Sequence, residues 1–320
     1  MKFITPVNIP QVEKKINIKD PLFFFGSCFS DEIGAVFLEN KFEVLSNPFG
    51  TIYNPVSMAN LLRYSIMEEP IPEDSFLQQQ GVFLNYLAHS KISGLSMNEA
   101  KQAMTDALEQ TKTFVRKCRH AFITMGTAII YEKNDMLVAN CHKVPQKQFI
   151  RRFITVREAE EGLQQISDYL RHVNPEISIT LTLSPVRHVK DDLRENSVSK
   201  AILRVAIANF IEKNEAVNYF PSYEIVLDEL RGYRFFKEDL VHPNHMAVKY
   251  IFERLSETFL DNKTKQWIPD WQKLRQGINH RPFNPETAEH RQFKKKLIQK
   301  LERIDFVDLS NEIAGLKKDL

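Results

Sequence analysis

A regular alternation of apolar strand-like runs with amphipathic helical stretches most constrains how this chain can fold. Leu22–Phe25 is a wholly apolar run ending in Gly26, as expected of a strand buried on both faces. Asp31–Glu39 has acidic residues in its first turn and apolar residues on one face, which predicts a helix. Such strand-then-helix units, repeated along the chain, predict a parallel sheet covered by helices on both faces.

The same pattern continues to about residue 260. Further strands are predicted at Ala121–Thr124, Ala128–Tyr131 and Ile177–Leu183, and a last one at either Tyr219–Pro221 or Tyr223–Val226. Helices are predicted at Asn98–Lys117, Val156–His172, Leu193–Lys213 and Met246–Leu260. We therefore expect a three-layer α/β/α sandwich around a mainly parallel sheet of about five strands.

The composition changes beyond Leu260. Trp267 and Trp271 lead into a polar stretch and then a charged helical run at Ala288–Ile304. We expect residues 1–260 to form the α/β domain and residues 261–320 to form a C-terminal helical extension packed on or beside it. Trp267 or Trp271 should be buried against the main domain, because a free tail would not need large aromatic side chains.

Charge and cysteine content exclude several classes of function. The formal net charge is +2, from 43 basic and 41 acidic side chains, so no excess charge indicates a nucleic-acid or membrane partner. We find no signal peptide and no apolar run long enough to span a bilayer. Cys28, Cys118 and Cys141 cannot all pair within one chain, which favours a cytoplasmic protein with reduced thiols. The oligomeric state is not indicated.

The turn at Gly26–Ser30 is the first candidate for chemistry. A nucleophile between a buried strand and a helix N-terminus lies close to helix amides, which stabilise an anion. Ser27 and Cys28 both occupy this turn. In the structural alternative, Ser27 or Ser30 caps the helix and Cys28 is a small buried hydrophobe.

Asp239 and His242 are the second candidate. They are three residues apart and directly precede an expected helix. In such a turn the carboxylate can accept the imidazole Nδ1–H, which leaves Nε2 free to take a proton from a nucleophile. Alone, this spacing is also common in helix caps. Combined with the N-terminal turn, it indicates a catalytic pair.

Together these blocks resemble the GSCFA branch of the SGNH/GDSL hydrolase superfamily. The motif of this branch appears here as Gly26-Ser27-Cys28-Phe29-Ser30. The resemblance covers roughly residues 20–260. It places Cys28 at the nucleophile position, with Ser27 as the alternative if the turn shifts by one residue. The other matching segments are Asn47–Tyr53, Met125–Thr127, Asn140–Lys143, Ser184–His188 and Asp239–His242.

The resemblance also implies an oxyanion hole. Gly50 matches a glycine whose N–H points into the hole, together with the Cys28 amide. The third block of the superfamily normally supplies an asparagine donor, but here it reads Gly126–Ile129 and lacks one. Loss of one such donor costs about 3–4 kcal/mol of transition-state stabilisation. The candidate replacements are Thr127, Asn47 and Asn54.

Three more polar residues are candidates for substrate binding. His142 either binds substrate or is a hydrogen-bonded core histidine. Arg187 and His188 follow the strand at Ile177–Leu183, at the carboxyl edge where open α/β sheets bind ligands. They could hold an anionic group of the substrate or cap the sheet edge through salt bridges.

The activity implied by the resemblance is that of an acyl-ester hydrolase or acyltransferase without a cofactor. Its substrate would be a small-molecule or carbohydrate-linked acyl ester. Cys28 would attack the carbonyl, His242 would act as general base and then general acid, and Asp239 would orient His242. We expect His242 to face Cys28. The helix N-terminus should lower the Cys28 pKa moderately, since Asp31 and Glu32 oppose that shift.

Two other classes of function remain open. The chain could hold a metal site, although the spacing of its potential ligands matches no common zinc motif. It could instead be a non-catalytic binding module that keeps the fold and the pocket, an alternative supported by the missing asparagine. The potential metal ligands are Asp239, His242, His245, His142 and Cys141.

Overall fold

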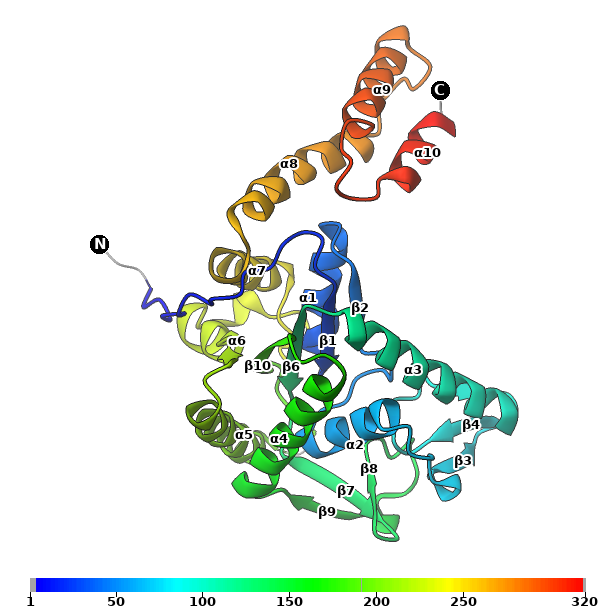
Figure 1. Cartoon of the computed structure of the whole chain (residues 1–320), viewed down its shortest axis with the longest axis vertical. Coiled ribbons are helices and arrows are strands. Elements are labelled where there is room, and N and C mark those ends of the chain that lie inside the picture. Colours follow the sequence, from blue (N-terminus) through cyan, green and yellow to red (C-terminus); the bar gives the residue numbers. More distant parts are fainter. Residues whose placement is uncertain (1–3, 191, 319–320) are drawn as a thin grey trace.

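Five parallel strands form the central sheet of the computed structural model, which describes residues 4–190 and 192–318 (Figure 1). All four strand pairings are parallel. The predicted three-layer α/β fold is therefore confirmed. The strand order is β11 (Val217–Tyr219), β10 (Ser178–Leu183), β6 (His120–Met125), β1 (Leu22–Gly26) and β2 (Val44–Ser46).

The apolar run of β1 explains why helices must cover both faces of the sheet. Phe23 and Phe25 point into one hydrophobic core, whereas Leu22 and Phe24 point into the other. All four side chains are at most 1% exposed. Alternate residues of a strand face opposite sides, so a run without polar residues requires an apolar layer on each side.

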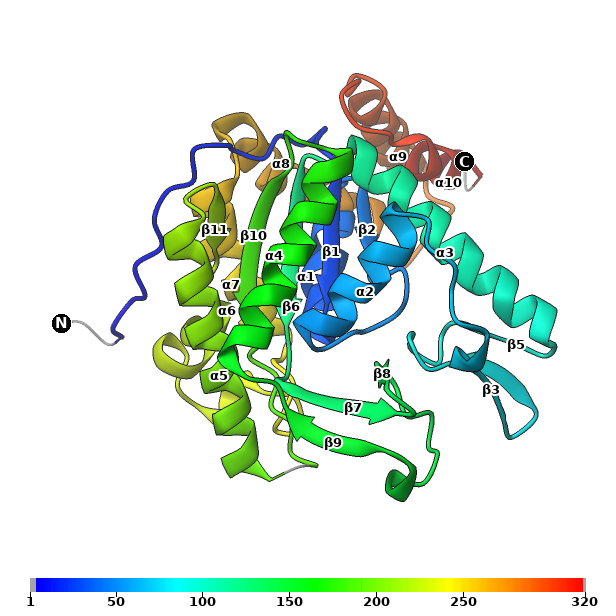
Figure 2. The ribbon, with the colours of Figure 1, turned by 60° about the horizontal axis from the view of Figure 1, so that its bottom comes forward.

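The two helical layers are distinct in Figure 2. One core is covered by α2 (Pro55–Ile66), α3 (Met97–Lys117), α4 (Val156–Val173) and α5 (Leu193–Lys213). The other is covered by α1 (Cys28–Glu39), the π-helical turn Ile225–Glu229 and α7 (His245–Phe259). The short α6 (Ser222–Glu224) directly precedes the π-helical turn. Single 3-10 turns lie at Glu73–Ser75, Gln146–Gln148 and Tyr233–Phe235.

Two predicted elements differ from the structure. The strand expected at Ala128–Tyr131 exists as β7 (Ile129–Lys133), but it lies outside the main sheet and pairs antiparallel with two neighbours. Those neighbours are β8 (Met136–Val138) and β9 (Ile150–Phe153). The last strand of the main sheet is β11, and the alternative at Tyr223–Val226 is wrong. That segment is helical. Ile225 and Val226 pack into the core that α7 covers, whereas Tyr223 packs against the other core.

Several elements had no clear sequence signal. They are β2, α2 and a small antiparallel sheet of β3 (Phe76–Gln79), β4 (Val82–Asn85) and β5 (Ser93–Gly94). The first helix also begins three residues earlier than expected, at Cys28, because Ser27 provides its N-cap.

The C-terminal helices α8 (Asn262–Ile278), α9 (Ala288–Leu301) and α10 (Ser310–Lys318) extend from the α/β part (Figure 1). Trp267 and Trp271 are 7% and 2% exposed. Their indole N–H groups donate to the backbone oxygens of Asn40, at 3.2 Å, and Glu39, at 2.7 Å. The expected burial of these tryptophans is confirmed. Nowhere in residues 4–190 and 192–318 is a helix both long and apolar enough to cross a bilayer.

Candidate functional site

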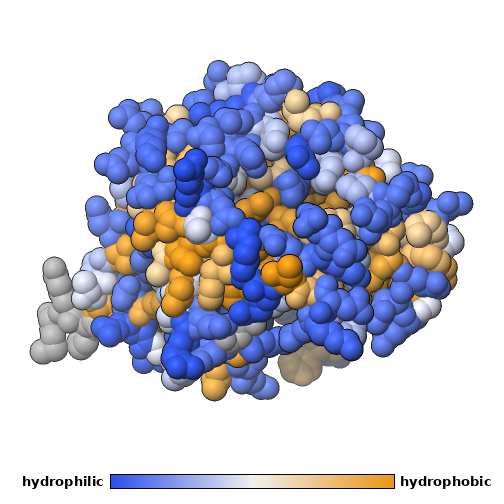
Figure 3. Space-filling view, turned by 90° about the horizontal axis from the view of Figure 1, so that it is seen from below, coloured by the Kyte–Doolittle hydropathy of each residue, from blue (hydrophilic) through white to orange (hydrophobic). Residues whose placement is uncertain are grey.

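The candidate site lies at the carboxyl edge of the sheet, where β1 turns into α1. Gly26 ends β1 with φ +141°, and a Cβ atom there would lie 2.1 Å from the backbone oxygen of Thr124 on β6. Only glycine permits this approach. Figure 3 views the molecule from below, the side on which β7 and β9 lie, and shows hydrophobic residues gathered across the middle with hydrophilic residues around them.

Ser27 and Cys28 have different environments although they are adjacent. Ser27 is 1% exposed, and its Oγ accepts the Phe29 N–H at 3.3 Å as the N-cap of α1. Ser30 is also buried and donates its hydroxyl to Thr124 Oγ1 at 2.8 Å. The capping role considered for Ser27 is thus confirmed. Cys28 is the first residue of the helix, is half-buried, and has a free thiol.

The environment of Cys28 raises the pKa of its thiol. Burial is the main cause, and the carboxylates of Asp31 and Glu32 add to it. The amide of Cys28 itself and the side chain of Lys200 act in the opposite direction. The expected lowering of the Cys28 pKa is therefore wrong, because desolvation of the thiolate outweighs the helix N-terminus.

Asp239 and His242 form the expected hydrogen-bonded pair, with 2.7 Å between His242 Nδ1 and Asp239 Oδ2. Asp239 Oδ1 also accepts the N–H groups of His242 and Val241, both at 2.9 Å. These backbone donors, and then the imidazole, lower the pKa of Asp239 to about 2. Asp239 is therefore a carboxylate at neutral pH.

The loop that carries this pair is connected to α1 one turn after Cys28. Lys237 Nζ lies 2.6 Å from Glu32 Oε1. His242 is partly exposed, and no hydrogen bond joins it to Cys28 in the part of the chain that the structure describes. That His242 faces Cys28 stays a prediction.

Gly50 and Asn47, two of the predicted oxyanion donors, shape the turn around Ser27. The Gly50 N–H donates to the Asn47 backbone oxygen at 2.8 Å, so it already has an acceptor. Asn47 Oδ1 accepts the Gly26 N–H at 2.8 Å, and its Nδ2 donates to the Ser27 oxygen at 3.3 Å. Asn47 therefore positions the backbone on both sides of the strand-to-helix turn.

Asn54 and Thr127, the other predicted donors, have local structural partners. Asn54 is the N-cap of α2 and accepts the Ser57 N–H at 2.8 Å. Thr127 Oγ1 accepts the Ile129 N–H at 3.0 Å and is 3.1 Å from Ser199 Oγ. Both side chains stabilise the loops in which they lie.

The backbone oxygen of Gly126 is the centre of a polar cluster that the sequence did not reveal. It accepts hydrogen bonds from His188 Nε2, at 3.1 Å, and from Lys200 Nζ, at 2.7 Å. Lys200 also donates to the Ser184 backbone oxygen at 2.7 Å. Tyr53 accepts the Gly126 N–H through its own backbone oxygen at 2.7 Å, and its ring lies edge-on to His188.

Two family models match this chain. The model of a family described as the GSCFA family matches residues 21–255. The chain belongs to the GSCFA family. A second model, described as the C-terminal domain of GSCFA domain proteins, matches residues 271–320. No curated protein matches the chain.

Two solved structures are similar to this GSCFA protein at low identity. One is a carbohydrate esterase of family 3 from Talaromyces cellulolyticus, with 12% identity and a TM-score of 0.28 over 49% of this chain. This chain spans only 63% of that esterase. The other is an acetyl esterase mutant with an acetate ion, with 10% identity and a TM-score of 0.35 over 78% of this chain and 99% of that one. TM-scores this low carry no argument, so the fold rests on the strand pairings above.

Arg187 and His188 have separate environments in the GSCFA protein. His188 belongs to the Gly126 cluster. The Arg187 guanidinium lies over the Phe236 ring, 5.3 Å from its centroid. A cavity of about 350 Å³ adjoins this pair, and Phe236 is only a few residues from Asp239. Arg187 is therefore available to an anionic group near the loop of the Asp–His pair.

His142 is a structural histidine. Its Nε2 donates to the Asn85 backbone oxygen at 2.7 Å, and its Nδ1 is 3.2 Å from Ser90 Oγ. Burial lowers the pKa of His142, which favours the neutral ring. Within residues 4–190 and 192–318, no three His, Cys, Asp or Glu side chains gather as a metal site. The five potential ligands named above therefore do not form one.

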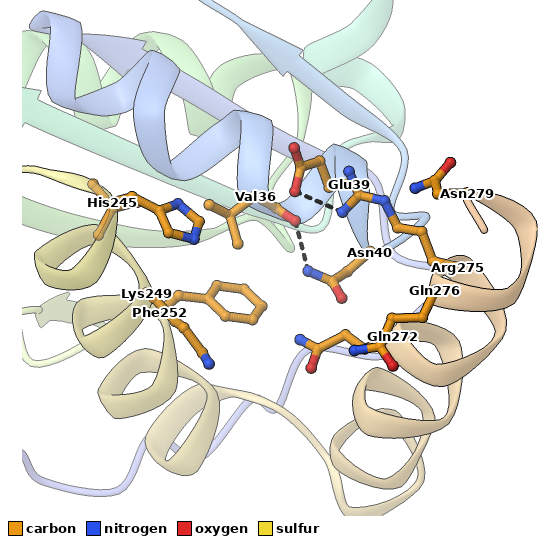
Figure 4. Close-up of a pocket in the computed structure, with 11 residues that line it drawn as sticks. Val36, Glu39, Asn40, His245, Lys249, Phe252, Gln272, Arg275, Gln276 and Asn279 are labelled. Carbon is orange, nitrogen blue, oxygen red and sulfur yellow. Dashed lines mark hydrogen bonds and ion pairs between the residues drawn. The ribbon is translucent and has the colours of Figure 1, made fainter. Parts of the chain in front are cut away.

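A cavity of about 490 Å³ lies elsewhere, between the C-terminal half of α1 and helices α7 and α8 (Figure 4). It is lined by polar side chains, including the Glu39–Arg275 ion pair at 2.8 Å, and by Phe252. Cys28 lies at the opposite end of α1. This cavity is therefore not part of the candidate site.

Lys200 and Tyr53 are the main site residues that sequence reasoning missed. Tyr53 contributes a backbone oxygen, which leaves no side-chain signal. Lys200 did leave a signal. The buried residues of α5 recur every three or four positions, and Lys200 occupies one of these core-facing positions between Asn196 and Leu203. A lysine on the apolar stripe of a helix is a candidate functional residue.

Proposed function

We propose that this protein is an acyl-ester hydrolase or acyltransferase of the SGNH type, with Cys28 as its nucleophile. The observation that carries the proposal is the half-buried thiol at the first residue of α1, beside a loop that holds the Asp239–His242 pair. The Lys237–Glu32 contact links that loop to the same helix, one turn after Cys28. A nucleophile, a base and a group that orients the base are the parts that acyl transfer needs.

In the proposed reaction, His242 Nε2 takes the thiol proton while Cys28 Sγ attacks the ester carbonyl carbon. Asp239 accepts the Nδ1–H and stabilises the imidazolium. The tetrahedral intermediate then expels the alcohol, which receives its proton from His242. The resulting thioester is attacked by water in hydrolysis, or by an acceptor hydroxyl in acyl transfer.

The raised Cys28 pKa supports a particular order of events. The resting nucleophile is a thiol, so the base must remove its proton during the attack rather than before it. For the oxyanion we propose the Cys28 amide as the first donor, since the Gly50 N–H already bonds to Asn47. Ser27 is the weaker candidate nucleophile, because it is buried and caps α1.

The proposed substrate is a small-molecule or carbohydrate-linked acyl ester. Arg187 is the candidate for binding an anionic part of it, because its guanidinium borders a cavity beside the loop of the Asp–His pair. His188 is less suited to this role, as its Nε2 donates to Gly126.

The test is an ester-hydrolysis screen with nitrophenyl esters and acetylated sugars, run on the wild type and four variants. Cys28→Ala and His242→Gln should each lose a hundredfold or more in kcat/KM, about the size of a general-base or nucleophile contribution. Ser27→Ala should stay within a few-fold, although loss of its cap costs about 1 kcal/mol of stability. Cys141→Ser is the control. Full activity in Cys28→Ala together with an inactive Ser27→Ala would transfer the nucleophile role to Ser27.

A non-catalytic ligand-binding role is the second candidate function. Gly50 and Thr127 already form local hydrogen bonds, so the predicted oxyanion hole lacks donors. This observation favours the binding role. In that case no ester in the screen is hydrolysed. Acylated sugars would instead raise the Tm of the wild type and of Cys28→Ala equally.

A further inference from the structure

The cavity of about 490 Å³ beside α8 has no role in the proposed reaction (Figure 4). Its lining residues from α1 and α7 lie within residues 21–255, which the first family model matches. Those from α8 lie within residues 271–320, which the C-terminal model matches. Small-molecule sites have volumes of about 300–1,000 Å³ and occur preferentially where two such parts meet. The cavity therefore has the size and the position of a ligand site.

A buried side chain presents an unpaired acceptor to this cavity. Asn40, the C-cap of α1, is 5% exposed, and its Nδ2 donates to the Val36 backbone oxygen at 2.8 Å. A carbonyl oxygen only accepts, so the amide nitrogen must face it and Asn40 Oδ1 faces the cavity (Figure 4). Within residues 4–190 and 192–318, no donor bonds to this oxygen. A ligand that fills the cavity must therefore supply a hydrogen-bond donor here, because an unpaired buried acceptor is costly.

Three more amides lie on the α8 side of the cavity. Gln272, Gln276 and Asn279 are spaced by four and then three residues, so they share one face of the helix. Each amide has one acceptor oxygen and two N–H donors. In the part of the chain that the structure describes, none of these three side chains has a hydrogen-bond partner. This side of the cavity therefore offers both donors and acceptors to a ligand.

The charged residues of the cavity have their own counter-charges. The Glu39 carboxylate pairs with Arg275 at 2.8 Å, and Lys249 Nζ lies 3.9 Å from Glu253 Oε1. A charged ligand would have to compete with these partners. An anion would also meet the negative end of the Asn40 amide, since like charges repel. The lining therefore favours a neutral ligand.

The floor of the cavity is apolar. Val248 and Phe252 are each 4% exposed, and the Phe252 ring packs edge-on against Phe37 with 5.1 Å between centroids. A sugar ring fits this combination, because its hydroxyl groups donate and accept while its C–H groups form apolar faces. An extended peptide fits less well. The lining residues belong to helices and their caps, so no strand edge is present for main-chain pairing.

We propose that this cavity binds a neutral carbohydrate unit. A ligand hydroxyl donates to Asn40 Oδ1, other hydroxyls bond to the amides of Gln272 and Gln276, and the C–H face of the ring packs on Phe252. Val36, the lining residue of α1 nearest to the nucleophile, is eight residues after Cys28, about 12 Å along the helix. Binding here requires no catalysis. The inference therefore goes beyond the proposed function.

The test is isothermal titration calorimetry of the full chain with neutral saccharides. They are glucose, galactose, mannose, xylose, N-acetylglucosamine, cellobiose and maltose. Glucose 6-phosphate and glucuronate are the charged comparators. At least one neutral saccharide should bind with a Kd of about 1 mM or lower. The charged comparators should bind about tenfold more weakly than that saccharide or not at all, because the cavity has no spare counter-charge.

The variant for this test combines Gln272→Ala with Gln276→Ala. Both side chains are exposed, so the variant should keep its fold. It should bind the saccharide about tenfold more weakly, because two hydrogen bonds are lost. Lys273→Ala is the matched control, since Lys273 is exposed on the same helix and lies outside the cavity lining. It should bind like the wild type.

Three results would overturn the carbohydrate site. They are no binding of any neutral saccharide, equal affinities in the double variant and Lys273→Ala, or tighter binding of a charged comparator. Calorimetry requires no ester substrate. Saccharide binding that depends on the α8 amides, in a protein without esterase activity, would therefore refute the proposed function alone. Esterase activity without such binding would refute this site alone.

Discussion

At the residue scale, the candidate site depends on which polar groups already form hydrogen bonds within the protein. Ser27 and Cys28 are neighbours, yet Ser27 bonds to the amide of Phe29 while the thiol of Cys28 is free. Gly50 and Asn47 likewise use their donors to build the turn. A residue that matches a functional motif by position can thus have a structural role, in which its hydrogen bonds fix the turn that holds a neighbouring residue.

Lys200 should make the stability of the protein depend on pH. Burial lowers its pKa from the ordinary 10.5 to about 7 in the folded state, so the unfolded state binds more protons between these values. The free energy of unfolding should therefore rise with pH in this window, by up to about 1.4 kcal/mol per pH unit. The stabilisation is lost as the pH falls toward 7.

The measurement is urea denaturation of the wild type and Lys200→Met between about pH 7 and pH 9, a range that begins at the folded-state pKa of Lys200 and ends below its ordinary value of 10.5. Burial raises the pKa of Cys28, which lowers stability only above its ordinary value of 9.0. The upper limit of pH 9 avoids that effect. Parallel curves for the two proteins would contradict the assignment to Lys200.

At the scale of elements, the turn from β1 to α1 depends on one glycine. Gly26→Ala should lower the free energy of unfolding by more than about 3 kcal/mol, because the new Cβ would meet backbone atoms of Thr124 at 2.1 Å and the residue has positive φ. Gly81 also has positive φ, at +81°, but open space surrounds it. Gly81→Ala should therefore cost only about 1–2 kcal/mol. Denaturant unfolding compares the two, and equal losses would show that backbone strain alone matters.

At the scale of the whole molecule, the C-terminal helices share a core with the α/β part. Trp271 packs with residues of α1 and α7 in one hydrophobic cluster and donates its N–H to Glu39. Trp271→Ala should destabilise the protein by about 3–5 kcal/mol, as is usual for a buried aromatic residue. Lys273→Ala, at an exposed position of the same helix, should have no measurable effect.

A chain truncated after Leu260 tests the division at that residue, which stays a prediction. Truncation removes Trp267, Trp271 and the apolar residues of α9 from the shared core. We expect a lower Tm and reduced solubility, because the matching surface of α1 and α7 becomes exposed. Unchanged values for both would show that residues 261–320 contribute nothing to the fold of the rest.

The sequence by itself determined the features that arise between near neighbours. The bounds of α5 and the strands β1, β6 and β10 follow from periodicity within a few residues. The Asp239–His242 bond follows from a spacing of three residues in one turn. Each of these patterns is complete within a single element or loop, so no knowledge of distant contacts was needed.

Only the tertiary structure decided the features that depend on distant segments. β7 lies outside the main sheet because it pairs with β8 and β9. The pKa of Cys28 lies above its ordinary value because folding removes the thiol from water. Lys200 donates a hydrogen bond to Gly126, 74 residues away in the chain, only because β6 and α5 meet at the sheet edge. Desolvation and long-range hydrogen bonding depend on the positions of all surrounding segments, which no local pattern contains.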